Sequence, residues 1–251
     1  MIHQKRRCLT VLFLAFLGGI LAGFLNVMAG GGSMITLPIL TALGLGIDVA
    51  NGTNRIAIIL QNLVAIERFR SKNVLKAKEA LLVSIPTIAG ALVGSSVAVQ
   101  IEKEVLQRIV GVIFLVMAFS LVWKPKIWVE DREVKRNWIL IYIVFFLIGI
   151  YGGFIQAGVG FLLIPAIALL LGYELVKTNA VKVFIVASYN LVSLIIFFLN
   201  GKVNVPYGLV LAFGNMTGAW IAASFSVKKG ARWVRWIVFA AVIVVGIRYV
   251  F

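Results

Sequence analysis

Two basic residues, Arg55 and Lys182, stand inside otherwise apolar segments, each just after a short polar stretch. Arg55 follows Asn51-Gly52-Thr53-Asn54, and Lys182 follows Thr178-Asn179-Ala180-Val181. A cation at such a place is tolerated when it faces a wet cavity or meets an anion. The alternative is that both side chains extend to the membrane interface as topology signals. The flanking asparagines make a polar face that this alternative does not require, and both interpretations stay open.

Two glycine-rich breaks are a second kind of candidate anion site. One runs from Asn26 to Pro38 through Gly30-Gly31-Gly32, and a weaker copy runs from Gly153 to Pro165 through Gly158-Val159-Gly160. A helix that restarts after such a break presents unpaired backbone N–H groups and the positive end of its dipole. We expect Ser33 to act as the N-cap in the first break. The alternative is close helix packing through small residues.

Amide side chains recur about two helical turns beyond each cation. Asn62 and Asn190 occupy matching places, on the helix face of the preceding polar residues at 3.6 residues per turn. They are candidate oxyanion ligands; the alternative is hydrogen bonding between helices, at about 0.6–2 kcal/mol each. The full set of candidate substrate ligands is Asn26, Gly31, Gly32, Ser33, Asn51, Asn54, Arg55, Asn62, Gln156, Gly158, Gly160, Asn179, Lys182 and Asn190.

The acidic residues are absent from the middle of the apolar segments. All 9 stand in connections or at segment ends, so none is expected at the membrane midplane, where proton relays and cation sites usually place a carboxylate. A single histidine and a single cysteine, His3 and Cys8, exclude a histidine-based metal site and an internal disulfide. We therefore predict no catalytic residues, no metal and no cofactor, and expect a protein that is not an enzyme.

The composition indicates an integral membrane protein. Of the 251 residues, 62% are hydrophobic and 13% are charged, whereas soluble domains have roughly 45–50% and 25%. The net charge of +15 would suggest nucleic acid in a soluble protein. Here the basic residues stand mostly in short connections, where they serve as topology signals and contact lipid headgroups. We expect a lipid bilayer and no nucleic acid as partner, and no cleaved signal peptide.

The apolar segments fall into two sets of five on either side of a charged linker at 124–137. They are 8–28, 33–45, 50–69, 79–99 and 105–123, then 138–156, 160–172, 175–199, 204–225 and 233–251. Segments 33–45 and 160–172 cover only about 20 Å of a hydrocarbon core of ~30 Å. The sequence predicts an all-α polytopic membrane protein in which each half has four long helices and one short re-entrant or broken helix.

The two halves match each other residue by residue at several polar positions. At a shift of 128, Asn51 meets Asn179, Asn62-Leu63-Val64 meets Asn190-Leu191-Val192, and Gly90-Ala91 meets Gly218-Ala219; at 127, Gly31 meets Gly158 and Pro38 meets Pro165. Matched asparagines in helices are unlikely by chance, so an internal duplication is predicted. Its parts are a first membrane repeat at 1–123, the linker at 124–137 and a second membrane repeat at 138–251.

Two topologies are compatible with the sequence. If the short segments are re-entrant, each half has four spans and both termini face the cytoplasm. If every segment crosses, the halves are inverted, as in many secondary transporters. The positive-inside rule does not separate the two, but both place the basic cluster at 68–78 in the cytoplasm.

These features together resemble the TauE/SafE family, the sulfite exporter group. The resemblance extends from about Gly18 to Gly246 and is strongest at Gly23–Pro38 with Ala50–Asn54, and at Gly149–Pro165 with Thr178–Ala180. Val181-Lys182-Val183 departs from the pattern where the first half has Thr53-Asn54-Arg55. Members of the family look like transporters of small sulfur-containing anions such as sulfite and organosulfonates.

The expected function is secondary transport of a small sulfur-containing anion, a sulfonate or sulfite, across the cytoplasmic membrane by alternating access. The anion would lie near mid-membrane between the two breaks, held by backbone N–H groups, Ser33 and nearby amides, with Arg55 and Lys182 supplying positive potential. An anion channel is the nearest alternative, and a membrane scaffold without transport is another. The sequence also leaves a homodimer open.

Overall fold

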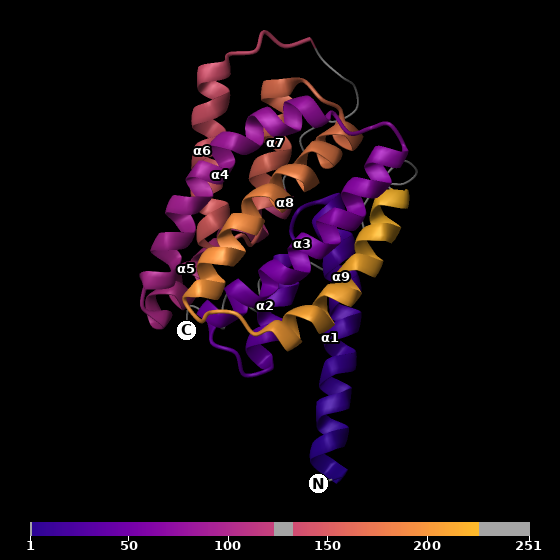
Figure 1. Cartoon of the computed structure of the whole chain (residues 1–251), viewed down its shortest axis with the longest axis vertical. Coiled ribbons are helices and arrows are strands. Elements are labelled where there is room, and N and C mark those ends of the chain that lie inside the picture. Colours follow the sequence, from indigo (N-terminus) through magenta and orange to yellow (C-terminus); the bar gives the residue numbers. More distant parts are fainter. Residues whose placement is uncertain (1, 123–132, 226–251) are drawn as a thin grey trace.

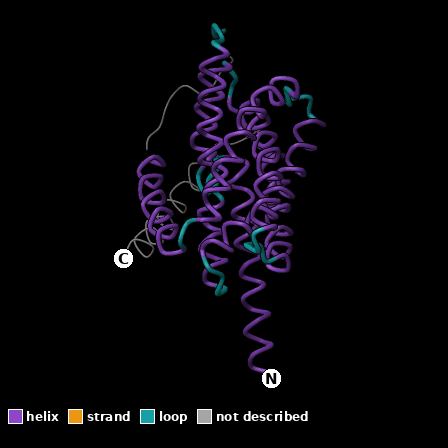
Figure 2. The backbone as a smooth tube through the Cα atoms, turned by 60° about the vertical axis from the view of Figure 1, so that its left-hand side comes forward, coloured by secondary structure: helices purple, strands orange, loops and turns teal. Residues whose placement is uncertain are grey.

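A computed structural model describes residues 2–122 and 133–225, and every regular element within them is a helix (Figures 1 and 2). The helices are α1 (Ile2–Met28), α2 (Ser33–Ala42), α3 (Ile47–Ser71), α4 (Ala77–Gln100), α5 (Lys103–Val122), α6 (Trp138–Phe154), α7 (Val159–Leu171), α8 (Leu175–Leu199) and α9 (Val205–Phe225). The predicted all-α class is confirmed for this part of the chain. The predicted segment 233–251 and most of the linker 124–137 lie outside the described residues.

The helices define two ends of the bundle. At the Lys202 end, Lys202 Nζ lies 2.5 Å from the Asp48 carboxylate, and Gly46 adjoins Lys103. This end therefore holds the loops that follow α2, α4 and α8. At the Arg68 end, Lys72 Nζ donates to the carbonyl of Ser224 at 3.0 Å, and Arg136 donates to that of Leu171 at 3.4 Å. This end holds the loops after α3 and α7 and the last turn of α9.

Two helix pairs pack in parallel through glycine. Along α1 and α9, Gly23 lies against the backbone of Asn215, and Gly218 lies against that of Ile20. Along α4 and α6, Gly90 lies against Phe146 and Gly153 lies against Ala91. A Cβ at any of these glycines would collide with backbone of the partner helix, which is how small residues let helices approach closely in membranes.

These contacts set the direction of the first helix in each half. Because α9 runs from the Lys202 end to the Arg68 end, its parallel partner α1 also enters from the Lys202 end. Because α4 runs from the Arg68 end to the Lys202 end, its parallel partner α6 enters from the Arg68 end, opposite to α1. Figure 1 shows the N-terminal part of α1 extending below the bundle, whereas α6 begins near the top.

The short helices turn back toward the end from which each half enters. Helix α2 leads from the break at 29–32 to the loop at 43–46, at the Lys202 end, and α7 leads from 155–158 to the Arg68 end. Each short helix therefore forms a hairpin with the helix before it, and the first hairpin (α1 and α2) and the second hairpin (α6 and α7) enter from opposite ends of the bundle.

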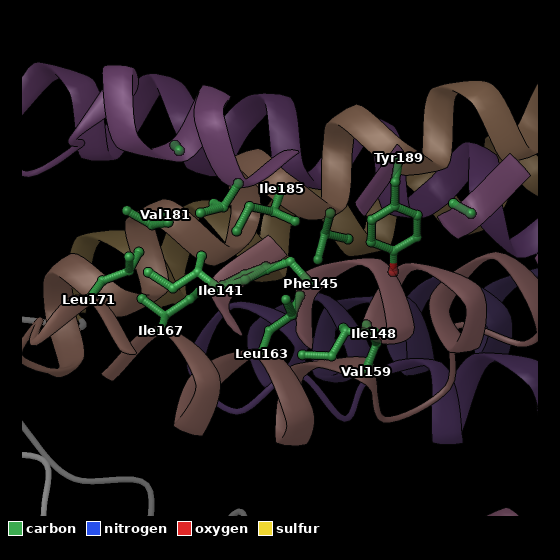
Figure 3. Packing of buried hydrophobic residues seen from close by; sticks show 14 of the residues in the cluster. Ile141, Phe145, Ile148, Val159, Leu163, Ile167, Leu171, Val181, Ile185 and Tyr189 are labelled. Carbon is green, nitrogen blue, oxygen red and sulfur yellow. The ribbon is translucent and has the colours of Figure 1, made fainter. Parts of the chain in front are cut away.

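An apolar cluster holds the second hairpin in place. Ile141 and Phe145 of α6, Leu163 and Ile167 of α7, and Ile185 of α8 are all buried in it (Figure 3). Truncating such side chains to alanine typically costs about 2–5 kcal/mol. The hairpin is therefore fixed to α8, which carries one of the two cations.

The outer surface is apolar, as expected of helices in lipid. Ile85 on α4, Ile139 on α6 and Leu199 on α8 are 61%, 75% and 78% exposed, and exposed apolar surface on this scale indicates contact with a membrane. Two helices of the described part, α4 and α8, are long and apolar enough to cross a membrane on length and composition alone.

Candidate functional site

The two hairpins meet tip to tip inside the bundle. Gly30 and Gly160 contact each other through their Cα atoms, so a Cβ on either would overlap the other. Gly30, Gln156 and Gly158 have φ of 82°, 62° and 73°, in the left-handed region that favours glycine. Close packing, one of the two interpretations of these breaks, is confirmed for Gly30 and Gly160. A non-glycine residue at such a φ is uncommon, and such strain concentrates at functional sites.

Lys182 closes the end of α1. Its Nζ donates to the carbonyl oxygens of Asn26 at 2.9 Å and Val27 at 2.7 Å, and to Asn179 Oδ1 at 2.8 Å. A helix that ends inside a membrane leaves unpaired carbonyls at the negative end of its dipole. Lys182 satisfies two of them with the three N–H donors that an ammonium has.

Arg55 does the same for α6. Its guanidinium donates to the carbonyls of Gly153 at 2.5 Å and Gly152 at 3.3 Å, and to Asn190 Oδ1 at 3.0 Å. Asn51, one turn earlier on α3, donates to the carbonyl of Phe154 at 2.8 Å. Each cation thus caps the hairpin of the other half.

Both cations are inside the protein, with exposed fractions of 0% for Arg55 and 1% for Lys182. The interpretation that they extend to the membrane interface is therefore wrong. No described carboxylate lies close to either one. Carbonyl dipoles satisfy their N–H groups but carry no net charge. The centre of the bundle is therefore electropositive, which favours an anion.

A small polar cavity lies beside the hairpin tips. Its polar lining comes from Asn26, Ser33, Gln61, Asn62, Gln156 and Lys182, and its apolar lining from Gly30, Ile58, Val159, Gly160 and Val186. The volume open to the centre of a water-sized sphere is about 10 Å³, roughly the room that one water needs. A larger anion does not fit in the described conformation until the lining moves.

The cavity wall is partly organised by an amide network. Asn26 Oδ1 accepts from the Gly32 N–H at 2.8 Å, and Asn26 Nδ2 donates to Gln61 Oε1 at 3.3 Å. Asn215 Nδ2 donates to the same Gln61 oxygen at 3.0 Å. Asn26 therefore joins the start of α2 to the middle of α3.

Two buried atoms of the cavity wall have no hydrogen-bond partner among the residues that the structure describes. They are Asn62 Nδ2, a donor, and Gln156 Oε1, an acceptor. Both residues are 2% exposed. Leaving such atoms unpaired costs about 1–3 kcal/mol each, so they are candidate contacts for a ligand or water.

The predicted candidates divide into two groups. The cavity is lined by Asn26, Ser33, Asn62, Gln156, Gly160 and Lys182. The others lie behind its wall or at the hairpin breaks, and they are Gly31, Gly32, Asn51, Asn54, Arg55, Gly158, Asn179 and Asn190. Asn179 holds Lys182, and Asn190 holds Arg55.

The expected role of Ser33 needs correction. Gly32 is the N-cap of α2, and no side chain caps that end. Ser33 is the first helical residue, and its Oγ accepts from Asn54 Nδ2 at 3.1 Å while Asn54 Oδ1 accepts from Thr36 at 2.7 Å. This cluster ties the start of α2 to α3, and the helix begins one residue earlier than a Ser33 N-cap would place it.

Gln61 and the apolar wall residues were not among the candidates. Gln61 stands beside Asn62, and Ile58 stands one turn before both, so the i, i+3 and i+4 spacing along α3 could have indicated a shared face. Val159 and Val186 carry no such signal, because their place at the cavity depends on how α7 meets α8.

Comparison with known proteins agrees with this architecture. The family profile described as sulfite exporter TauE/SafE matches residues 15–249. A "Probable membrane transporter protein" of Haemophilus influenzae is 27% identical over 90% of this chain and 89% of its own length. The "Probable membrane transporter protein YfcA" of Escherichia coli K12 is 28% identical, over 88% and 82%. These are transporters and not enzymes, and the chain belongs to the sulfite exporter TauE/SafE family of membrane transporters.

Proposed function

We propose that this protein is a secondary transporter that moves a small sulfur-containing anion, sulfite or an organosulfonate, across the cytoplasmic membrane by alternating access. The observation that carries the proposal is Lys182, buried at the wall of a small polar cavity with no carboxylate of the described residues beside it. The choice of a sulfur oxyanion rests on the family description, sulfite exporter.

The cavity offers an anion several favourable contacts. Lys182 contributes charge, while Asn62 Nδ2 and the Ser33 hydroxyl can donate hydrogen bonds. Helices α2 and α7 begin at the cavity with no side-chain cap, so the positive ends of their dipoles add to the attraction. Arg55 lies behind the wall and adds positive potential from the opposite hairpin.

The arrangement of the helices supports an internal duplication with inverted halves, divided as 1–123, 124–137 and 138–251. The first helix of each half packs in parallel on the fourth helix of the other half, α1 on α9 and α6 on α4. The two hairpins enter from opposite ends, which is typical of inverted repeats in secondary transporters. Movement of one hairpin at a time would open the cavity to one side and then to the other.

The basic residues suggest the orientation in the membrane. The Arg68 end carries Arg68, Arg70, Lys72, Lys76, Lys78, Lys135, Arg136 and Lys177. The Lys202 end carries Lys103, Arg108 and Lys202, to which Lys5, Arg6 and Arg7 at the start of α1 add. Under the positive-inside rule, the basic residues of the described part therefore favour the Arg68 end as the cytoplasmic side.

Transport into liposomes tests the proposal. Purified protein should take up labelled sulfite or 2-hydroxyethanesulfonate with saturation and should exchange internal for external anion. Lys182→Met should reduce uptake at least about tenfold, equivalent to ~1.4 kcal/mol, whereas Lys182→Arg, which keeps the charge, should retain part of it. Lys78→Met, which removes an exposed lysine, is the matched control and should not change uptake.

Two results would contradict the proposal. Uptake that rises linearly with concentration and shows no exchange would indicate a channel. Uptake of neither anion by a protein that remains folded, judged by its thermal transition, would reject transport of sulfur oxyanions. Equal uptake by Lys182→Met and the unmodified protein would reject the role of Lys182.

A further inference from the structure

Some polar atoms of the cavity wall already form hydrogen bonds within the described residues, and others do not. The ammonium of Lys182 donates to three oxygens, and the amide of Asn26 bonds on both sides. Gln61 Oε1 accepts twice. Asn62 Nδ2 and Gln156 Oε1 are buried and have no hydrogen-bond partner among the described residues. These two atoms are therefore the ones that a ligand must satisfy.

An amide brings a carbonyl acceptor together with its N–H donors. The oxygens of an anion can accept from the N–H groups of Asn62 and Gln156, but they cannot satisfy either carbonyl. Gln156 Oε1 is buried and unpaired in the present conformation. An anion with acceptor atoms only would keep that oxygen unpaired when it displaces water from the cavity, and a buried unpaired acceptor weakens binding.

We infer that the anion bound here also carries a hydrogen-bond donor, such as a hydroxyl, an ammonium or a protonated oxygen, which the Gln156 carbonyl accepts. This inference rests on the proposed function and makes it more specific. The oxyanion group contacts Lys182, Asn62 and Ser33, and the donor group contacts the tip of the second hairpin. The unusual φ of 62° at Gln156 is consistent with a side chain held in place for binding.

The same contact explains how binding could act on the second hairpin. Gln156 lies in the turn between α6 and α7, whereas Asn62 is on α3 and Lys182 is on α8. A ligand that bonds to Gln156 and Asn62 and lies against the charge of Lys182 joins the hairpin tip to the two long helices. An anion without a donor contacts α3 and α8 but makes no bond to the Gln156 carbonyl. It therefore stabilises the closed position of the hairpin tip less.

The experiment compares two sulfonates of equal charge and nearly equal size. 2-Hydroxyethanesulfonate carries a terminal hydroxyl where 1-propanesulfonate carries a methyl group. Their dissociation constants are measured by titration calorimetry on the purified full-length protein. We expect the hydroxyl compound to bind at least about tenfold more tightly, because the methyl compound leaves a buried carbonyl unpaired.

Variants locate the source of the preference. Gln156→Gly removes the amide and also suits the positive φ at this position, so we expect it to fold and to bring the ratio of the two dissociation constants near one. Asn62→Leu should lower the affinity for both compounds and change their ratio less. The matched control is Ser193→Ala, which removes a buried unpaired hydroxyl that is not part of the cavity wall, and the ratio should persist.

The outcomes separate this inference from the proposed function. If both sulfonates bind equally to the unmodified protein, the donor requirement is wrong, while anion binding stands. A preference that survives Gln156→Gly would show that another group accepts the hydroxyl and would also overturn the inference. If sulfite and both sulfonates fail to bind to folded protein, the proposed function fails and the inference fails with it.

Discussion

Arg55 and Lys182 show why a cation can be stable at the centre of a membrane protein without an acidic partner. Each one donates to the carbonyls at the end of a helix that stops inside the bundle. Those carbonyls would otherwise remain unpaired in a region without water, at a cost of several kcal/mol each. The cations therefore serve the fold first, and the electropositive field that favours an anion follows from the same contacts.

A conservative substitution at Arg55 should reveal this structural role. The guanidinium reaches Gly152, Gly153 and Asn190 at once, which the single ammonium of lysine cannot reproduce with the same geometry. We expect Arg55→Lys to lower the stability of the purified protein by about 1–3 kcal/mol, because a buried carbonyl is left unpaired. Thermal unfolding in detergent measures the change.

The control for that prediction is Arg70→Lys, at an exposed position in the last turn of α3. It should leave the unfolding temperature nearly unchanged. If the Arg55→Lys protein is as stable as the Arg70→Lys protein, then the capping of α6 does not depend on the forked geometry of the guanidinium N–H groups.

Among the helices, the two hairpins are the elements that could move. A cation from the other half binds the backbone carbonyls at the end of the first helix of each hairpin, and Asn51 does so for α6 as well. Glycines let the tips of the two hairpins touch. The Gly30 and Gly160 contact closes the cavity on the side of the tips. A transporter that opens alternately would need to break this contact and reform it.

Gly160→Ala tests whether closure matters. The added methyl group would overlap Gly30 and hold the tips apart, at a cost of about 1–3 kcal/mol for overpacking. We expect anion uptake to fall about tenfold, equivalent to ~1.4 kcal/mol, while the protein remains folded. Liposome uptake and thermal unfolding measured on the same preparation separate the two effects.

Gly46→Ala is a suitable control, because a Cβ there would meet the flexible side chains of Asp48 and Lys103 and no backbone. Its uptake should stay close to that of the unmodified protein. Full uptake by Gly160→Ala would show that transport does not require the tips to meet.

At the scale of the whole molecule, opposed entry of the hairpins is the main feature. Helices α3 and α8 run in opposite directions between the ends, and each contributes one cation to the centre. The cavity therefore lies beside the tips of two hairpins that enter from opposite ends of the bundle.

Cysteine labelling in intact cells can test the orientation. In a Cys8→Ser background, Lys76→Cys marks the Arg68 end and Asn200→Cys marks the Lys202 end, and both positions are exposed. We expect a membrane-impermeant maleimide to label Asn200→Cys and to leave Lys76→Cys unlabelled until the cells are opened, because the proposed orientation puts the basic end in the cytoplasm. The reverse pattern would invert the orientation, and labelling of both in intact cells would contradict the separation of the two ends.

The sequence by itself determined the features that depend on local pattern. Hydropathy and length placed every described helix, with α8 predicted at its observed bounds, because apolar segments and their breaks are properties of contiguous residues. The glycine breaks and the two cations were also evident, since polar groups within apolar segments are conspicuous. Membership of the family followed from the same residues.

Only the tertiary structure decided which groups meet. The backbone carbonyls that Arg55 and Lys182 bind come from the opposite half of the chain, about 100 to 150 residues away, and no local pattern encodes such pairings. The direction in which each hairpin enters and the division of the asparagines between cavity wall and support depend on the same long-range packing. Polar residues occur on more than one face of a helix, and the helices packed around it determine which of these faces lines a cavity.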